Sequence, residues 1–156
     1  ANDTNKATAA TMYQNGVQVI FSAAGGAGSS VINAATESSA TDYVIGVDVD
    51  QSSKSDLVIT SAMKELGNAV KQALQAYVDG TFVGGTTVIK GVSNDGVGLP
   101  FANSVFANFT EAEYTAVYAL LVAGTVVVPD DYATLETFLT ALGSTGYPTQ
   151  SVVAPE

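Results

Sequence analysis

Three residue types that carry much of protein chemistry are missing from this 156-residue chain, namely cysteine, histidine and arginine. Without cysteine, the chain can form no disulfide, no thiolate nucleophile and no cysteine-ligated metal site. Without histidine, it lacks the commonest general base and the commonest transition-metal ligand, which excludes Ser-His-Asp and Cys-His mechanisms. We therefore expect a protein that is not an enzyme and that holds neither a metal ion nor a cofactor.

Charge is also scarce, and most of it is negative. Charged residues make up 13% of the chain, whereas soluble domains average roughly 25%. Five basic residues stand against 15 acidic ones, for a net charge of −10. Binding to phosphates relies on arginine forks and basic patches, so we expect neither nucleic acid nor an anionic lipid surface as a partner. A surface built from Ser, Thr, Asn, Gln and Tyr is typical of secreted or cell-surface proteins.

Long apolar runs are absent too, although 47% of the residues are apolar. The longest candidates, residues 119–123 and 125–129, are separated by Gly124 and are too short to span a membrane. The composition instead indicates one globular domain with a substantial core. The chain opens on a polar, helix-like segment, so we expect a strand upstream of it and a longer protein of which this is a piece.

Apolar segments alternate with helix-length segments along the chain, which predicts an α/β fold with a parallel sheet. The strands read as continuous apolar runs, which indicates helices on both faces and hence a three-layer αβα architecture. Asp3 or Thr4 is the expected N-cap of the first helix, and Thr110 with Glu113 forms a capping box for a later one. The predicted helices are 3–14, 28–37, 62–78, 110–123 and 130–142; the predicted strands are 17–22, 43–48, 57–61, 86–92 and 97–99, with 126–128 as a possible edge.

Two strand ends mark the candidate ligand site, because ligands of open parallel sheets bind beyond the carboxyl ends of the strands. Phe21 ends the first strand; such an aromatic residue is more often core, and the alternative is a ring that stacks on a base or sugar. Asp48 ends the second strand; its carboxylate suits the hydroxyls of a sugar, and the alternative is a cap on the following loop. Asp50 is expected to be a loop or surface residue.

The glycine-rich turn at residues 25–28 has two interpretations. It follows a strand and opens a helix, where backbone amides can cradle a phosphate. It matches neither the dinucleotide fingerprint nor the Walker A motif, so a tight turn that allows close approach is the favoured interpretation. The acidic segment after the second strand does not match a calcium loop either, because Ser53 and Ile59 stand where glycine and the closing acid are required.

Several ordered motifs resemble the basic membrane lipoprotein family, which are substrate-binding proteins of ABC transporters related to purine-nucleoside receptors. The resemblance covers about residues 1–129. Its motifs are Val-Ile-Phe-Ser-Ala-Ala-Gly-Gly-Ala-Gly at 19–28, Ile-Gly-Val-Asp-Val-Asp-Gln at 45–51, Thr-Ser-Ala-Met-Lys at 60–64, Gly-Thr-Phe-Val-Gly-Gly at 80–85, Gly-Val-Gly-Leu at 96–99 and Gly-Thr-Val-Val-Val-Pro at 124–129.

The resemblance implies one lobe of a type I periplasmic-binding fold, which is flavodoxin-like, with the ligand held between two lobes. Residues 1–129 would be the C-terminal ligand-binding lobe without its first strand, and residues 130–156 a helix and irregular tail packed on the same lobe. The N-terminal lobe, a signal peptide and a lipidated cysteine would lie upstream, which places the protein on the extracellular face of the cell membrane. Its implied partners are a transporter permease and a small ring-containing solute such as a nucleoside.

The same resemblance implies roles for individual residues. Phe21 matches the aromatic residue that stacks on the nucleobase, and Gly46 matches a backbone contact that puts Asp48 beside the cleft. Gly67, next to Asn68, stands where the family often has a ribose-binding aspartate, and Ser93 stands where it often has a lysine. The expected ligand-binding set is Phe21, Gly25, Gly26, Gly46, Asp48, Gly67 and Asn68. The alternative function is a non-catalytic ligand-sensing receptor or regulator module on the same fold.

Overall fold

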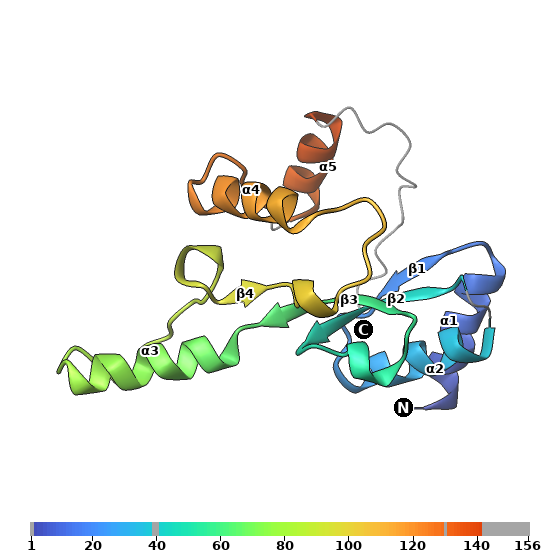
Figure 1. Cartoon of the computed structure of the whole chain (residues 1–156), viewed down its shortest axis with the longest axis horizontal. Helices are drawn as coiled ribbons and strands as arrows, with labels where there is room; N and C mark the ends of the chain where they lie inside the picture. The colour runs from blue at the N-terminus through green and yellow to red at the C-terminus, as the bar shows by residue number, and fades with distance from the viewer. Residues whose placement is uncertain (1, 39–40, 130, 142–156) are drawn as a thin grey trace.

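The computed structural model describes residues 2–38, 41–129 and 131–141, and it confirms the α/β prediction. Four strands form one sheet in the order β1-β2-β3-β4 (Figure 1). The first three run parallel, and the last is antiparallel to its neighbour. The strands are β1 (Val19–Phe21), β2 (Tyr43–Asp48), β3 (Val58–Lys64) and β4 (Val97–Gly98).

Two helices cover one face of the sheet and pack against each other: α1 (Asp3–Gln14) and α2 (Gly28–Ser38). Both match their predicted ranges closely. The N-cap of α1 is Asn2, whose side-chain oxygen accepts a hydrogen bond from the Asn5 amide at 2.8 Å, so the prediction of Asp3 or Thr4 was wrong by one or two residues. An asparagine makes this bond as well as aspartate does.

The hydrophobic core of the described residues lies in the first part of the chain. The inward face predicted for α2 is confirmed, since Val31, Ile32 and Ala35 are all buried. The Tyr13 hydroxyl donates to the Tyr43 carbonyl at 3.0 Å and ties α1 to β2. Among the described residues, every buried hydrophobic side chain lies between residues 9 and 58: Ala9, Tyr13, Ile20, Val31, Ile32, Ala34, Ala35, Val44, Val47 and Val58.

Strand β3 is longer than predicted, and helix α3 (Leu66–Val78) is correspondingly shorter. The sequence predicted a helix from residue 62, whereas Met63 and Lys64 pair with Gly98 and Val97 of β4. The Glu65 amide then donates to the Gly96 carbonyl at 3.0 Å. Pairing with a distant strand overrides the local helical pattern at these positions.

The strand predicted at residues 86–92 does not form. The outer edge of β3 is already occupied by β4. Backbone groups of this segment form local hydrogen bonds instead. The Asn94 side chain accepts a hydrogen bond from the Gly91 amide at 2.8 Å and donates one to the Ile89 carbonyl at 3.1 Å. Such side-chain bonds to the backbone compete with sheet ladders. The possible edge at 126–128 is not a strand either, and β1 is shorter than the predicted 17–22.

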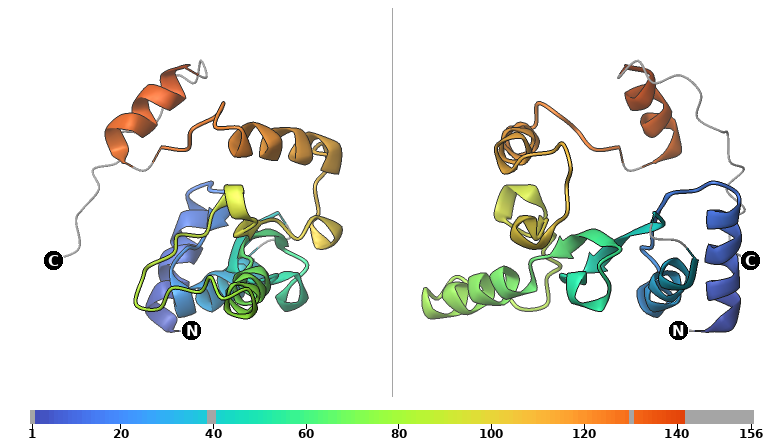
Figure 2. Two further views of the ribbon diagram at one scale, coloured as in Figure 1. Left: turned by 90° about the vertical axis from the view of Figure 1, so that its left-hand side faces the viewer. Right: turned by 45° about the vertical axis from the view of Figure 1, so that its right-hand side comes forward.

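The second half of the chain is more open, as two further views show (Figure 2). Helix α3 extends from the sheet as an arm, and its apolar stripe of Leu66, Val70 and Leu74 is more than half exposed. Helix α4 (Glu111–Val122) begins with the predicted capping box of Thr110 and Glu113, and α5 (Tyr132–Ala141) follows. Of the described helices, none has the length and apolar character to cross a membrane. The predicted irregular tail from residue 143 lies outside the described residues.

Candidate functional site

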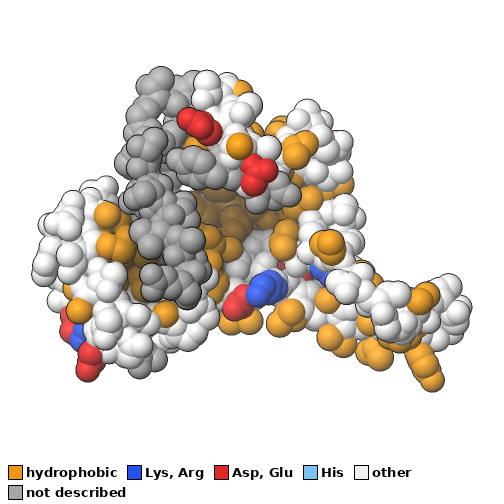
Figure 3. Space-filling model, turned by 180° about the vertical axis from the view of Figure 1, so that it is seen from behind, with side chains coloured by type: hydrophobic (Ala, Val, Ile, Leu, Met, Phe, Trp, Pro, Cys, Tyr) orange, Lys and Arg blue, Asp and Glu red, His pale blue; other side chains and the backbone are white. Residues whose placement is uncertain are grey.

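A cavity, called the main cavity below, lies at the carboxyl ends of the three parallel strands, where α4 forms its other wall. It has a volume of about 590 Å³, which lies within the range of small-molecule sites. Figure 3 shows a hollow on this face with hydrophobic side chains inside it. The lining residues are Phe21, Ala23, Gly25, Val47, Asp48, Ala62, Met63, Lys64, Val92, Val97, Gly98, Leu99, Tyr114, Tyr118 and Leu121.

Phe21 lines this cavity from the last position of β1. Its side chain is 54% exposed, whereas its neighbour Ile20 points to the opposite face and is 8% exposed. Successive residues of a strand face opposite sides, so burying Ile20 in the core turns Phe21 outward. The core alternative for Phe21 was therefore wrong, and the ring offers a flat apolar face to the cavity.

Asp48 also lines the cavity, and it is held there by a lysine. Its carboxylate lies 2.7 Å from the Lys64 ammonium group, and both side chains are substantially exposed. An exposed ion pair of this kind contributes only about 0–1 kcal/mol to stability. The Asp48 carboxylate can therefore accept hydrogen bonds from a ligand at little cost. The Asp48 backbone is left-handed at φ 69°. Such strain in a residue other than glycine clusters at ligand sites.

Lys64 was missing from the predicted site, although its motif at residues 60–64 was recognised. The expected helix from residue 62 separated it from the strand ends. In the structure it ends β3, one strand away from Asp48.

Gly46 does not reach the cavity, because it is covered by two side chains. A Cβ at this position would stand 2.5 Å from the Ser61 hydroxyl and 3.0 Å from the Gln51 Cβ. The Gln51 amide donates to that hydroxyl at 3.1 Å, and the Gln51 side chain donates to the Val47 carbonyl at 3.0 Å. Gly46 thus permits the turn after β2 to fold back behind Asp48.

The remaining predicted residues are divided between the cavity and its surroundings. Gly25 lines the cavity, and its backbone is left-handed at φ 54°. Gly26 beside it does not line the cavity. Gly67 lies in α3, where an added Cβ would meet no atom within 4 Å. Asn68 lines a second, smaller cavity, and its amide donates to the Asp95 carbonyl at 3.3 Å. The structure therefore brings together Phe21, Gly25 and Asp48 but not the other four.

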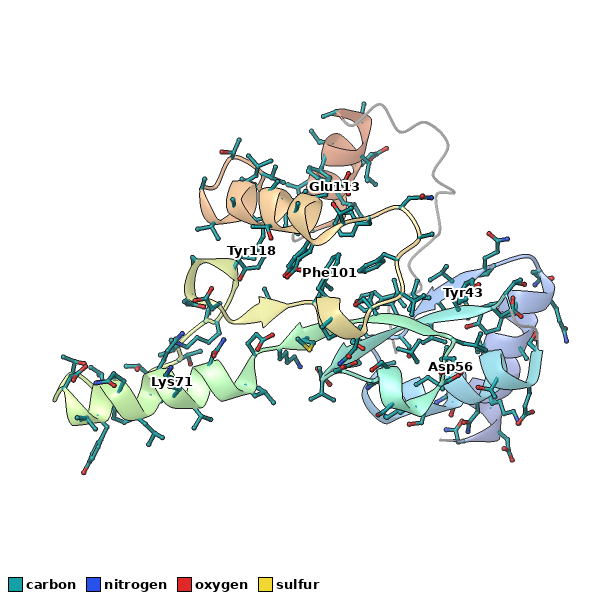
Figure 4. The ribbon with its side chains drawn as sticks, viewed as in Figure 1. Tyr43, Asp56, Lys71, Phe101, Glu113 and Tyr118 are labelled. Carbon is teal, nitrogen blue, oxygen red and sulfur yellow. The ribbon has the colours of Figure 1, made fainter. Side chains whose placement is uncertain are left out.

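The α4 wall was not predicted from the sequence. Tyr114, Tyr118 and Leu121 face the cavity, and their spacing of four and three residues places them on one helical face. The single Tyr118 hydroxyl donates to two carbonyls, that of Val92 at 3.2 Å and that of Val97 at 3.3 Å. These bonds hold α4 over β4 (Figure 4). Helical spacing alone indicates a buried face but not which surface that face covers.

Aromatic packing supports this wall. The Phe101 ring lies 5.8 Å from the Tyr114 ring and 5.3 Å from the Phe106 ring, measured between centroids. Figure 4 shows Phe101 and Tyr118 between α4 and the sheet. The cavity is thus apolar and ring-lined, with the Asp48–Lys64 pair as its charged contact. Such a lining suits reversible binding of a flat solute with polar substituents.

Comparisons with known proteins show the family to which the chain is related. The family model described as ABC transporter substrate-binding protein PnrA-like matches residues 1–131. Basic membrane protein D of Borreliella burgdorferi is 34% identical over 138 residues, which cover 86% of this chain and 40% of that protein. The ABC transporter nucleoside-binding protein BmpA of Lactococcus lactis is 35% identical over 115 residues, 64% of this chain and 33% of that protein. The chain spans well under half the length of these curated relatives.

Solved structures agree on the fold. A solute-binding protein of an ABC transporter system from Aeropyrum pernix superposes with a TM-score of 0.61 at 22% identity, covering 90% of this chain and 48% of that one. A transcriptional activator of the comK gene from Bacillus halodurans superposes with a TM-score of 0.59 at 16% identity, covering 78% and 41% respectively. The fold predicted from the sequence is therefore that of solute-binding proteins.

Proposed function

Because the chain belongs to the PnrA-like family of ABC transporter substrate-binding proteins, we propose that it is part of the solute-binding component of an importer. Its solute is a nucleoside or a closely similar ring-bearing molecule. The protein binds this solute without transforming it and delivers it to a membrane permease. The complete protein is held at the extracellular face of the membrane by a lipid anchor.

The observation that carries this proposal is the exposed ring of Phe21 at the end of β1. A side chain of this size usually packs in the core, yet this one is 54% exposed beside a cavity. A base that stacks on it would meet Leu99 and Tyr118 on the other cavity walls. The Asp48 carboxylate accepts hydrogen bonds from ligand hydroxyls, and the Lys64 ammonium group donates to ring or hydroxyl oxygens.

We further propose that residues 1–129 form one lobe of a two-lobed protein and that residues 130–156 pack on the same lobe. The relatives are more than twice as long as the matched segment, which supports a second wall for the cavity. Closure of two lobes around a solute is a hinge motion. In this arrangement Gly25 meets the solute directly, whereas Gly26 and Gly46 shape the turns behind the cavity. Gly67 and Asn68 lie at the margin of the solute.

The test is a thermal-shift screen of the full-length gene product against a panel of nucleosides. Ligand at 100 times its Kd stabilises the folded state by about 2.7 kcal/mol, which raises Tm by several degrees. Phe21→Ala should weaken nucleoside binding at least tenfold. Val19→Ala is the matched control, since Val19 is 42% exposed on the same strand and does not line the cavity. An unchanged Tm with every nucleoside, together with a shift from another solute, would overturn the choice of ligand.

The second candidate is a ligand-sensing receptor or regulator module. It is kept because a transcriptional activator shares this fold. The coding sequence upstream separates the two candidates. A signal peptide with a lipidation cysteine supports the importer, and a helix-turn-helix segment would refute it.

A further inference from the structure

A second cavity adjoins the first beside β4 and α4, and its own lining residues are all polar or acidic. Its volume is about 360 Å³. The two cavities are neighbours around β4 and α4, because they share five lining residues: Val97, Gly98, Leu99, Tyr114 and Tyr118. Its lining is Glu65, Asn68, Asp95, Val97, Gly98, Leu99, Tyr114, Thr115 and Tyr118.

Glu65 presents a carboxylate to this cavity. Its backbone is fixed by the bond from its amide to the Gly96 carbonyl at 3.0 Å. One of its carboxylate oxygens lies 3.0 Å from the point where a Cβ on residue 98 would stand, so only glycine leaves this space open. Within the described part of the chain, the Glu65 carboxylate has no hydrogen-bond or ion-pair partner, although the residue is partly buried.

Two tyrosine rings also line this cavity, and the Tyr114 hydroxyl lies 3.7 Å from the same Cβ point at residue 98. The centroids of Tyr114 and Tyr118 lie 5.8 Å apart, and the negative faces of such rings attract cations. Asp95 adds a second carboxylate at the mouth. Burial raises the pKa of Tyr118, and the charges of Asp95 and Glu65 add to this effect. The electrostatic potential around Tyr118 is therefore negative.

The nearest lysines are directed to other groups: Lys64 pairs with Asp48 in the main cavity. None of the cavity's lining residues is a lysine, and the chain has no arginine. Lys90, five residues before Asp95, donates to the side-chain oxygen of Gln72 and does not line the cavity. A metal ion is a poor candidate for this space, since the described residues contain no group of three acidic side chains placed to hold one.

We propose that the second cavity is a subsite for the ammonium group of a small organic cation. The ammonium group sits against the two tyrosine rings and is neutralised by Glu65 and Asp95. This inference goes beyond the proposed function, because the subsite takes a cation whether or not a ring occupies the main cavity. A solute that carries both a ring and an ammonium group spans the two cavities around Gly98.

The test uses two probes of the same shape, choline and 3,3-dimethyl-1-butanol, which differ in having a quaternary nitrogen or a neutral carbon. Binding is followed by NMR titration of the full chain. We expect choline to bind at least tenfold more tightly than its neutral analogue and to perturb the amides of residues 65–68 and 95–98. Equal affinity for the two probes, or no binding of choline, would overturn the proposal.

Glu65→Gln should abolish most of the preference for choline at unchanged fold. Asp56→Asn is the matched control, because Asp56 is an exposed carboxylate remote from both cavities (Figure 4). If Glu65→Gln and Asp56→Asn reduce the affinity for choline equally, the effect is one of net charge and the proposed subsite is refuted. The nucleoside screen is a separate measurement on the main cavity, so either proposal can fail while the other stands.

Discussion

Replacing Gly46 by alanine tests how the turn behind the cavity is packed. The backbone of Gly46 is not left-handed, so alanine is allowed there by its dihedral angles and any effect must be steric. The added methyl group would lie 2.5 Å from the Ser61 hydroxyl and 3.1 Å from the Gln51 side-chain oxygen. Ser61 is completely buried, and it cannot move away without disturbing β3.

The expected cost follows from two contributions. Forcing a methyl group into packed surroundings costs about 1–3 kcal/mol. Displacing the Ser61 hydroxyl breaks its bond with the Gln51 amide, which adds about 1 kcal/mol. The free energy of unfolding should therefore fall by about 2–4 kcal/mol, which is a large part of the stability of an ordinary domain.

Urea unfolding followed by circular dichroism measures this change. With an m-value of about 2 kcal/mol per molar, the midpoint should drop by about 1–2 M. Gly26→Ala is the control, because nothing lies within 4 Å of its added methyl group, and it should change stability by no more than about 0.5 kcal/mol. In a Ser61→Ala background, Gly46→Ala should cost at least about 1 kcal/mol less. Equal midpoints for Gly46→Ala and Gly26→Ala, or an undiminished cost in that background, would refute the steric argument.

Three further predictions concern other parts of the molecule. Asp48→Gly should raise stability by about 1 kcal/mol in urea unfolding, because it relieves a left-handed backbone; a lower stability would mean that the ion pair with Lys64 outweighs the strain. Burial, with a smaller effect of Asp42, raises the pKa of Tyr13 from 10.0 to about 12. Its stabilising contribution is therefore complete below pH 10 and lost between pH 10 and about 12, so wild type should lose stability there more steeply than Tyr13→Phe. Thr110→Ala should cost about 1 kcal/mol and speed amide exchange at the start of α4, whereas faster exchange in α2 instead would contradict a local capping role.

The elements that the sequence predicted well are those whose neighbours are close along the chain. Helix α2 and strand β2 have nearly the expected bounds, because the buried faces of Val31 and Val44 meet within one βαβ unit. The capping box at Thr110 was also predictable, since both of its partners lie within four residues. Short-range patterns contain the whole explanation of such elements.

The elements that were wrong depend on distant partners. Met63 is in a strand because Gly98 pairs with it, and residues 86–92 are not in one because that edge is taken. The same dependence on distant partners separates the site residues that were predicted from those that were missed. Phe21 and Asp48 follow from strand ends, whereas Tyr118 and Glu65 reach their cavities through the placement of α4 and β4. A single sequence without its pairing partners does not specify that placement.

In the part of the chain that the structure describes, the buried hydrophobic side chains are confined to residues 9–58, which divides this part into regions that open independently. Amides of β1, β2 and α2 should exchange with solvent through global unfolding, because breaking them exposes the whole core. Helices α3 and α4 contain no fully buried side chain, so they should exchange through local opening at a much lower free energy. The α4 wall of the main cavity is thus more labile than the sheet wall, and a ligand bound between them would slow amide exchange first in α4.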